Sequence, residues 1–288
     1  LEALWKAHLE SPGLEADVQL DGPLIFGGRS RLRTEAAALR GNLHMPPGAA
    51  LPQGLTAGVA GQCAFNIGTS AFSLQRAALS TLGVEGQGDL HLDGGGKVPS
   101  WRGTLHLQCR DLGATLRQAT GQSPDLPAPL RRWQVSGNFS GQEGSLAVTG
   151  MQARASQITL EGDASLQWKG ARPALRFDLV SPHFDLDAFM AAAFPDTGGR
   201  NDAPGQPWDL RAMKAFDAEG VLHVQRLTAW KFNLSSLSVP LKLQEGRLRC
   251  DAVRANCYGA PLRASVDARF DRGLELALDV RANDIDVE

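Results

Sequence analysis

Two histidine–carboxylate pairs come nearest to a chemical centre in this sequence. His91 precedes Asp93, and His183 precedes Asp185, by two residues, so each pair falls on one side of an extended strand. A metal site needs further ligands at matching spacing, and neither pair has a third one. We therefore interpret both pairs as surface strand residues. The sequence predicts no catalytic residue, no metal and no cofactor, and we expect that the protein is not an enzyme.

Other residue types that could support chemistry also lack the required pattern. Gly94-Gly95-Gly96-Lys97 is not flanked by the residues of a phosphate loop and predicts a turn. The cysteines match no zinc or redox spacing, and we interpret them as small apolar strand residues; they are Cys63, Cys109, Cys250 and Cys257. Cys250 and Cys257 would lie about 23 Å apart on one extended strand. That is too far for a disulfide unless the chain bends back.

Charge and composition narrow the class of protein further. The 288 residues carry a formal net charge of −2, which gives no electrostatic case for a nucleic-acid partner. Thirty-two glycines among short apolar runs are typical of many short strands and turns. The chain opens at Leu1 without Met and shows no signal peptide. We therefore expect it to be a piece of a longer protein.

Alternation of apolar and polar residues is the main structural signal. Leu160 and Leu166 point to one side of a predicted strand, and Glu161 and Gln167 to the other. Such strands predict a mainly β protein with a long, curved antiparallel sheet that has one dry and one wet face. Predicted strands cover residues 14–20, 29–36, 39–45, 58–66, 70–79, 84–93, 101–109, 133–140, 144–150, 156–168, 173–181, 218–231, 236–243, 246–258, 260–270 and 274–283.

Helices are expected at only a few places. Leu1, Leu4, Trp5, His8 and Leu9 have helical spacing and predict an amphipathic helix that ends at Pro12-Gly13.

A repeated motif predicts two more helices. Asp111-Leu112-Gly113-Ala114 returns as Asp185-Leu186-Asp187-Ala188, and a third copy begins at Asp284. Each aspartate is placed to cap a helix N-terminus, and a further brief helix is expected over 208–215.

These copies divide the chain into repeated multi-strand units, each closed by a short helix. The first predicted unit, over 1–54, is the end of a preceding repeat and contains a helix and strands. Full repeats follow over 55–130 and over 131–207, and the second of these includes a linker. A truncated unit of C-terminal type follows over 208–288.

A few short helices cannot cover the dry face of so many strands. The sheet must curl into a trough or sandwich, or its dry face must bind something apolar. From the alternation we place on this face Val18, Leu20, Leu90, Leu92, Leu105, Leu107, Leu160, Leu166, Phe177, Leu179, Leu276, Leu278 and Val280. A register error of one residue would reverse the assignment.

The last predicted unit resembles the C-terminal region of the AsmA family. The resemblance rests on the order of Glu245-Gly246-Arg247-Leu248 and Asn256-Cys257-Tyr258-Gly259. Ala260 stands where the family pattern usually has a second glycine. Asp185-Leu186-Asp187 and Asp284-Ile285-Asp286 resemble the recurrent helix entry of the family, and the resemblance extends over about residues 55–288.

This resemblance implies an envelope protein of Gram-negative bacteria whose body lies in the periplasm and is anchored in the inner membrane by a segment outside this piece. It implies a taco-like β-groove, similar to bridge-like lipid transfer proteins, that binds phospholipid acyl chains. It also implies a role in lipid transport between the inner and outer membranes and in outer-membrane biogenesis, with inner- and outer-membrane proteins as further partners.

Two other functions stay open at the level of sequence. A closed sandwich whose outer face or edge strands bind proteins would be a non-enzymatic scaffold or assembly factor for outer-membrane proteins. A carbohydrate-active β fold would need carboxylates and aromatic residues gathered in a cleft, and the sequence gives no sign of such a cleft.

Overall fold

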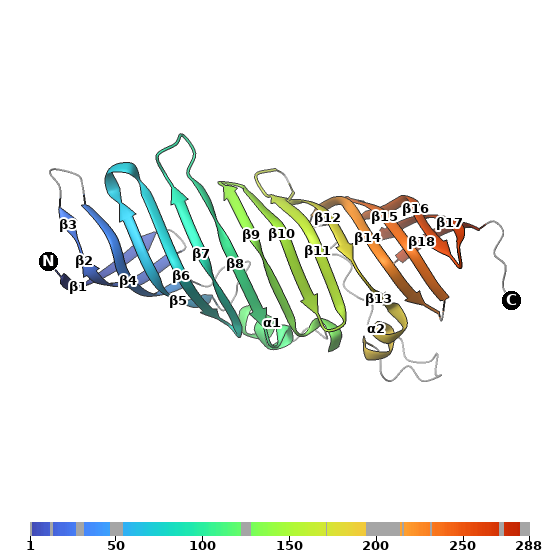
Figure 1. The fold of residues 1–288 in the computed structure, drawn as a ribbon, viewed down its shortest axis with the longest axis horizontal. Coiled ribbons are helices and arrows are strands. Elements are labelled where there is room, and N and C mark those ends of the chain that lie inside the picture. Colours follow the sequence, from blue (N-terminus) through green and yellow to red (C-terminus); the bar gives the residue numbers. More distant parts are fainter. Residues whose placement is uncertain are drawn as a thin grey trace. The chain divides into compact units, whose positions relative to one another are not determined.

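The computed structural model describes residues 2–11, 14–26, 32–46, 54–121, 128–170, 172–193, 214, 216–230, 232–270 and 274–282. Strands dominate these ranges, and two α-helices accompany them, so the chain is mainly β (Figure 1). The chain forms two compact units, residues 1–143 and 144–288, called unit 1 and unit 2 below. The predicted helix over 208–215 falls outside the described residues except for residue 214.

Unit 1 contains an antiparallel sheet in which neighbours along the chain are mostly neighbours in space. Its strands are β1 (Glu2–Ser11), β2 (Leu14–Pro23), β3 (Ile25–Phe26), β4 (Leu32–Met45), β5 (Leu55–Asn66), β6 (Ala71–Thr81), β7 (Val84–Asp93), β8 (Ser100–Cys109) and β9 (Trp133–Gln142). β1 pairs with β2, and both β2 and β3 pair with β4. From β4 to β9, each strand pairs with the next one along the chain. The short helices η2 (Ile67–Thr69) and η3 (Ala128–Leu130) lie in connections.

Unit 2 contains a mixed sheet. Its strands are β10 (Ser145–Ala155), β11 (Ile158–Gln167), β12 (Ala174–Ser181), β13 (Phe184–Asp185), β14 (Asp217–Ala229), β15 (Phe232–Gln244), β16 (Arg247–Cys257), β17 (Ala260–Phe270) and β18 (Leu274–Ala282). β14 runs parallel to β12 and β13, and the remaining described pairs are antiparallel. The prediction of a purely antiparallel sheet is therefore wrong at β12–β14, because the connection through α2 returns the chain to the starting end of β12.

The predicted N-terminal helix is wrong. β1 pairs with β2 along its whole length, with Trp5 opposite Leu20 and Ala7 opposite Val18. An isolated helix of this length is marginal in water, whereas an adjacent strand satisfies the backbone of β1 at every second residue. Tertiary pairing therefore overrides the helical spacing of Leu4, Trp5 and His8.

Both aspartate-capped helices form where the repeat predicts them. α1 (Leu112–Thr120) begins after Asp111, whose Oδ1 accepts a hydrogen bond from the Ala114 N–H at 3.1 Å. α2 (Leu186–Ala193) begins after Asp185, whose Oδ1 accepts from the Ala188 N–H at 2.8 Å. Each cap satisfies one of the N–H groups that a helix N-terminus leaves unpaired.

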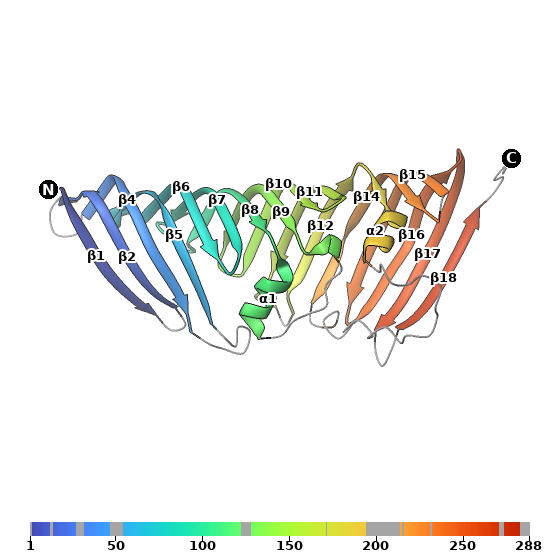
Figure 2. The same ribbon diagram turned by 90° about the horizontal axis from the view of Figure 1, so that it is seen from below.

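The strands of each unit are bent at β-bulges. In unit 1 the register shifts between Thr34 and Ala37, between Ala60 and Gln62, and between Leu74 and Ala77. In unit 2 it shifts within β10, β15 and β16. A bulge bends its strand and increases the local twist, and the strands within each unit are visibly bowed in Figure 2. Close contacts between described elements follow the strand pairings, with α2 against β14 and η2 against β4 in addition, and the described strands of each unit include no separate second sheet.

Candidate functional site

The register places the predicted dry-face residues of unit 1 together. Residues directly opposite on paired strands lie on the same face of a sheet. Leu20 faces Leu39, Leu90 faces Leu74, and Leu92 faces Phe72. These pairs and the pairs between them place all the predicted dry-face residues of this unit on one face: Val18, Leu20, Leu90, Leu92, Leu105 and Leu107. We call this surface the apolar face of unit 1.

Of the most buried part of this face, only Cys63 was expected from the sequence to be a small apolar strand residue. Ala37, Leu39, Cys63 and Leu74 form a buried cluster, with Cys63 only 1% exposed. The register shifts place an extra residue in β4, between Thr34 and Ala37, and in β6, just after Leu74, so the apolar phase shifts by one residue within these two strands and their alternation is broken in sequence. The partly buried residues packed against the cluster come from β2, β5, β6 and β7 of the same sheet. Burial raises the pKa of the Cys63 thiol.

The predicted dry-face residues of unit 2 also share one face. Phe177 lies opposite Ala164 on β11 and Gly220 on β14, and Leu179 lies opposite Leu222. The pairings place all the predicted dry-face residues of this unit on the same face of its sheet: Leu160, Leu166, Phe177, Leu179, Leu276, Leu278 and Val280. We call this surface the apolar face of unit 2.

Exposure changes along the apolar face of unit 2. Ala218, Leu243 and Ala268 form a buried cluster. On β18, by contrast, Leu278 is 61% exposed, and Leu276 and Val280 are more than half exposed. The described residues pair β18 only with β17, so no neighbouring strand in the described part of the chain shields the outer side of these side chains. A row of exposed aliphatic residues on one face is a surface to which an apolar ligand can bind.

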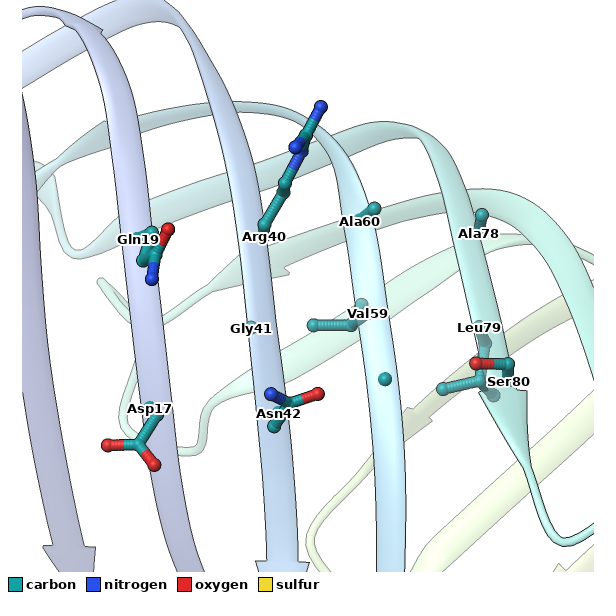
Figure 3. A pocket seen from close by; sticks show the side chains of 11 residues that line it. Asp17, Gln19, Arg40, Gly41, Asn42, Val59, Ala60, Ala78, Leu79 and Ser80 are labelled. Atoms are coloured by element: carbon teal, nitrogen blue, oxygen red, sulfur yellow. The ribbon is translucent and has the colours of Figure 1, made fainter.

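The polar faces carry shallow hollows. In unit 1 a hollow of about 450 Å³ is lined by residues that include Asp17, Gln19, Arg40, Asn42 and Ser80 of the polar face (Figure 3). Its polar side chains come from β2, β4 and β6 and alternate with the apolar-face residues of the same strands. None of the residues that the sequence predicted for the apolar face lines this hollow, but Val59 and Leu79, which the register places on that face, border it.

The described residues contain no arrangement suited to metal binding. No group of three or more His, Cys, Asp or Glu side chains comes together within the described ranges. His91 and Asp93 lie on the polar face of β7, opposite Arg102 and Ser100. The four cysteines are all buried free thiols, and burial, followed by the charge of Asp251, raises the pKa of Cys250.

Among the helices of the described segments, none is long and apolar enough to span a membrane. What the geometry offers is two curved sheets whose apolar faces are not covered by a second layer of strands within the described part of the chain. Such faces can bury the hydrocarbon part of a ligand and leave its polar part in solvent.

No protein family, no curated protein and no solved structure was found to match the chain.

Proposed function

We propose that the apolar faces of the two units bind the acyl chains of phospholipid. The observation that carries the proposal is the exposure of Leu276, Leu278 and Val280 on a face whose inner part is already apolar and buried. Transfer of an acyl chain from water to such a surface gains about 0.8 kcal/mol for each buried CH₂. This binding requires no reaction chemistry, in keeping with a non-enzymatic protein.

The wider role follows from the resemblance to the AsmA family. In this proposal the chain is the periplasmic part of an AsmA-like protein anchored in the inner membrane. Its repeated units, each closed by a short helix such as α1 or α2, form a taco-like β-groove. The groove contributes to phospholipid transport between the inner and outer membranes and so to outer-membrane biogenesis. The bent strands and the face-by-face segregation of side chains support this architecture.

Native mass spectrometry combined with lipid extraction tests the proposal. The purified wild-type protein is expected to carry phospholipid. A variant with Leu276→Glu and Leu278→Glu places two carboxylates on the exposed apolar face and should lose most of this lipid. Because both side chains are already largely exposed, the fold should persist, as checked by circular dichroism.

A matched control adds the same charge to the opposite face. Ala277 and Gln167 are exposed residues of the polar faces of β18 and β11. The variant with Ala277→Glu and Gln167→Glu should keep its lipid. A wild-type protein that carries no lipid and takes up no fluorescent phospholipid would contradict the proposal, as would equal lipid loss in both variants.

A second candidate function is a scaffold or assembly factor for outer-membrane proteins. It is favoured by β18, which the described residues pair on one side only, because such an edge can add a strand of another protein. This function predicts that β18 gains protection from hydrogen exchange when an outer-membrane protein segment in an extended conformation is added. Lipid binding alone does not require that protection.

A further inference from the structure

Exposed aromatic residues gather at one end of the unit 2 sheet, in the turns between strands. Trp230, in the β14–β15 turn, is 76% exposed, and Tyr258, in the β16–β17 turn, is 59% exposed. Phe232 contacts Tyr258 with ring centroids 6.5 Å apart. These turns lie at the same end because Leu234 on β15 is opposite Cys257 on β16. Three large rings therefore project from one rim of the sheet.

The main chain at this rim is held in place. The Trp230 N–H donates a hydrogen bond to Asp187 Oδ1 of α2 at 2.7 Å. Trp230 and Tyr258 both have positive φ values, 51° and 49°, a conformation that large residues rarely adopt. A glycine or asparagine would fit these turns with less strain. The presence of aromatic residues at strained, exposed positions indicates a function for the rings themselves.

A row of arginines crosses the polar face close to this rim. Arg254 lies directly opposite Arg263, and Arg263 lies directly opposite Arg281, on three adjacent strands. The three line a hollow of about 340 Å³ together with the carboxylates of Asp251 and Asp279. Asp279 pairs with Arg281 at 3.1 Å. Among the described residues no ion pair forms with Arg254 or Arg263, although like charges directly opposite each other destabilise a sheet.

Another basic cluster on the same face, which also holds Arg249 and Arg269, is partly neutralised by an internal ion pair. Arg247 lies opposite Arg269, but its guanidinium donates two hydrogen bonds to the carboxylate of Asp267, one of them at 2.9 Å. The row formed by Arg254 and Arg263 has no such partner. Its positive charge is therefore available to an external anion, and arginine is well suited to phosphate groups.

The spacing between rings and arginines matches the interface of a lipid bilayer. Arg254 is three residues from Cys257 at the strand end, or about 10 Å along the strand. Tryptophan and tyrosine favour the membrane–water interface. Basic side chains at the height of the lipid phosphates are attracted by anionic headgroups. Rings inserted at the interface would leave the arginine row near the phosphate layer.

We propose that this rim of unit 2 docks on the surface of an anionic phospholipid bilayer, with Trp230, Phe232 and Tyr258 inserted at the interface and Arg254, Arg263 and Arg281 against the lipid phosphates. The proposal goes beyond acyl-chain binding and rests on other side chains. Docking would place the end of the apolar face that carries Phe232 at the membrane surface, where a lipid could enter or leave.

Co-sedimentation with vesicles tests the docking. The wild-type protein is expected to bind vesicles that contain phosphatidylglycerol, to bind phosphatidylcholine vesicles weakly, and to be released by salt. Each basic residue near an anionic surface contributes about a fivefold gain in binding, so Arg254→Gln with Arg263→Gln should weaken binding roughly 30-fold. Trp230→Ser with Tyr258→Ser should also weaken it, and the Trp230 N–H can still bind Asp187.

The control removes the same charge elsewhere. Arg102→Gln with Arg154→Gln changes two exposed arginines on the polar faces of β8 and β10 and should leave vesicle binding unchanged. Equal weakening in the two arginine double variants would overturn the proposal, as would wild-type protein that ignores anionic vesicles. Wild-type protein that binds immobilised polyglutamate but no vesicles would overturn it in favour of an acidic protein partner.

The two proposals can fail separately. The Arg254→Gln, Arg263→Gln variant should still carry co-purified phospholipid in native mass spectrometry while it no longer sediments with vesicles. A wild-type protein that sediments with anionic vesicles but carries no lipid would support docking and count against acyl-chain binding.

Discussion

The centre of the apolar face in unit 1 and the end of the apolar face in unit 2 are made of similar strands with very different exposure. Leu74 on β6 is 6% exposed, whereas Leu278 on β18 is 61% exposed. Leu74 has an apolar-face neighbour on each side, Cys63 on β5 and Leu90 on β7. Leu278 has Val266 on β17 and, within the described residues, no neighbour on its other side.

This difference shows that alternation decides the face of a residue but not its burial. Burial without a second layer depends on the strands to either side and on how sharply the sheet bends. The centre of unit 1 therefore acts as a core and should dominate stability. The β18 end of unit 2 should contribute little to stability and remain available to a ligand.

The largest effect is expected from truncation of the two leucines. Leu74→Ala should lower the free energy of unfolding by about 2–3 kcal/mol, because it removes buried methyl groups and leaves a cavity. Leu278→Ala should change it by less than about 0.5 kcal/mol, as for other exposed positions. Urea unfolding followed by circular dichroism measures both values. Similar losses for the two variants would show that burial does not separate these regions.

The next largest difference is expected between the stability effects of glycine substitutions in the two units. A Cβ added at Gly220 in unit 2 would lie 2.2 Å from the carbonyl oxygen of Phe177 and 2.6 Å from its ring Cγ. Gly220→Ala should therefore cost about 1–3 kcal/mol by overpacking. At Gly58 in unit 1 the nearest atom is the Ser80 hydroxyl oxygen at 3.1 Å, which can rotate away. Gly58→Ala should cost less than about 0.5 kcal/mol in the same unfolding experiment.

The helix caps should behave alike in the two units. Asp111→Ala and Asp185→Ala each remove a side-chain acceptor at a helix N-terminus, and each should cost about 1 kcal/mol. Hydrogen exchange should accelerate in α1 for the first variant and in α2 for the second. Asp111→Asn and Asp185→Asn keep an acceptor and should retain most of the protection. Loss of protection throughout a unit would indicate that the helix supports its sheet.

The smallest effect concerns acid stability in unit 2. The hydrogen bond from Arg247 lowers the pKa of Asp267. A carboxylate whose folded pKa is depressed stabilises the fold above its unfolded pKa of about 4. That contribution is lost as the pH falls through the lower, folded pKa. Asp267→Asn and Arg247→Gln should therefore both flatten the decline of stability below about pH 4 in urea titrations, and an unchanged decline would show that the pair is not coupled to folding.

Much of the local structure could be predicted from the sequence. The strand positions follow from alternation with period two, and the two caps follow from aspartates placed before Leu112 and Leu186. The strand register also places the predicted apolar residues on one face of each sheet, because period-two alternation is kept wherever a strand has no bulge. Where bulges interrupt it, next to Ala37 in β4 and Leu74 in β6, the buried residues could not be identified from alternation.

Other features could not be predicted because they depend on partners distant in sequence. The segment from Glu2 to Ser11 has helical spacing, yet its pairing with β2 makes it a strand. The arginine row and the aromatic rim come together only through the register of β14 to β18, and no local pattern marks them. The direction of β14 depends on the sheet end to which the connection after α2 returns.

By itself, the sequence determined that this chain is mainly β, that its strands have an apolar and a polar side, and that aspartates begin both described α-helices. These properties depend on neighbours within a few residues, through side-chain alternation and local hydrogen bonds. The tertiary structure alone decided which apolar residues are buried, where β12 and β14 run parallel, and which charges face each other. These depend on pairing between distant segments, for which the free energy comes from the assembled sheet and not from any one strand.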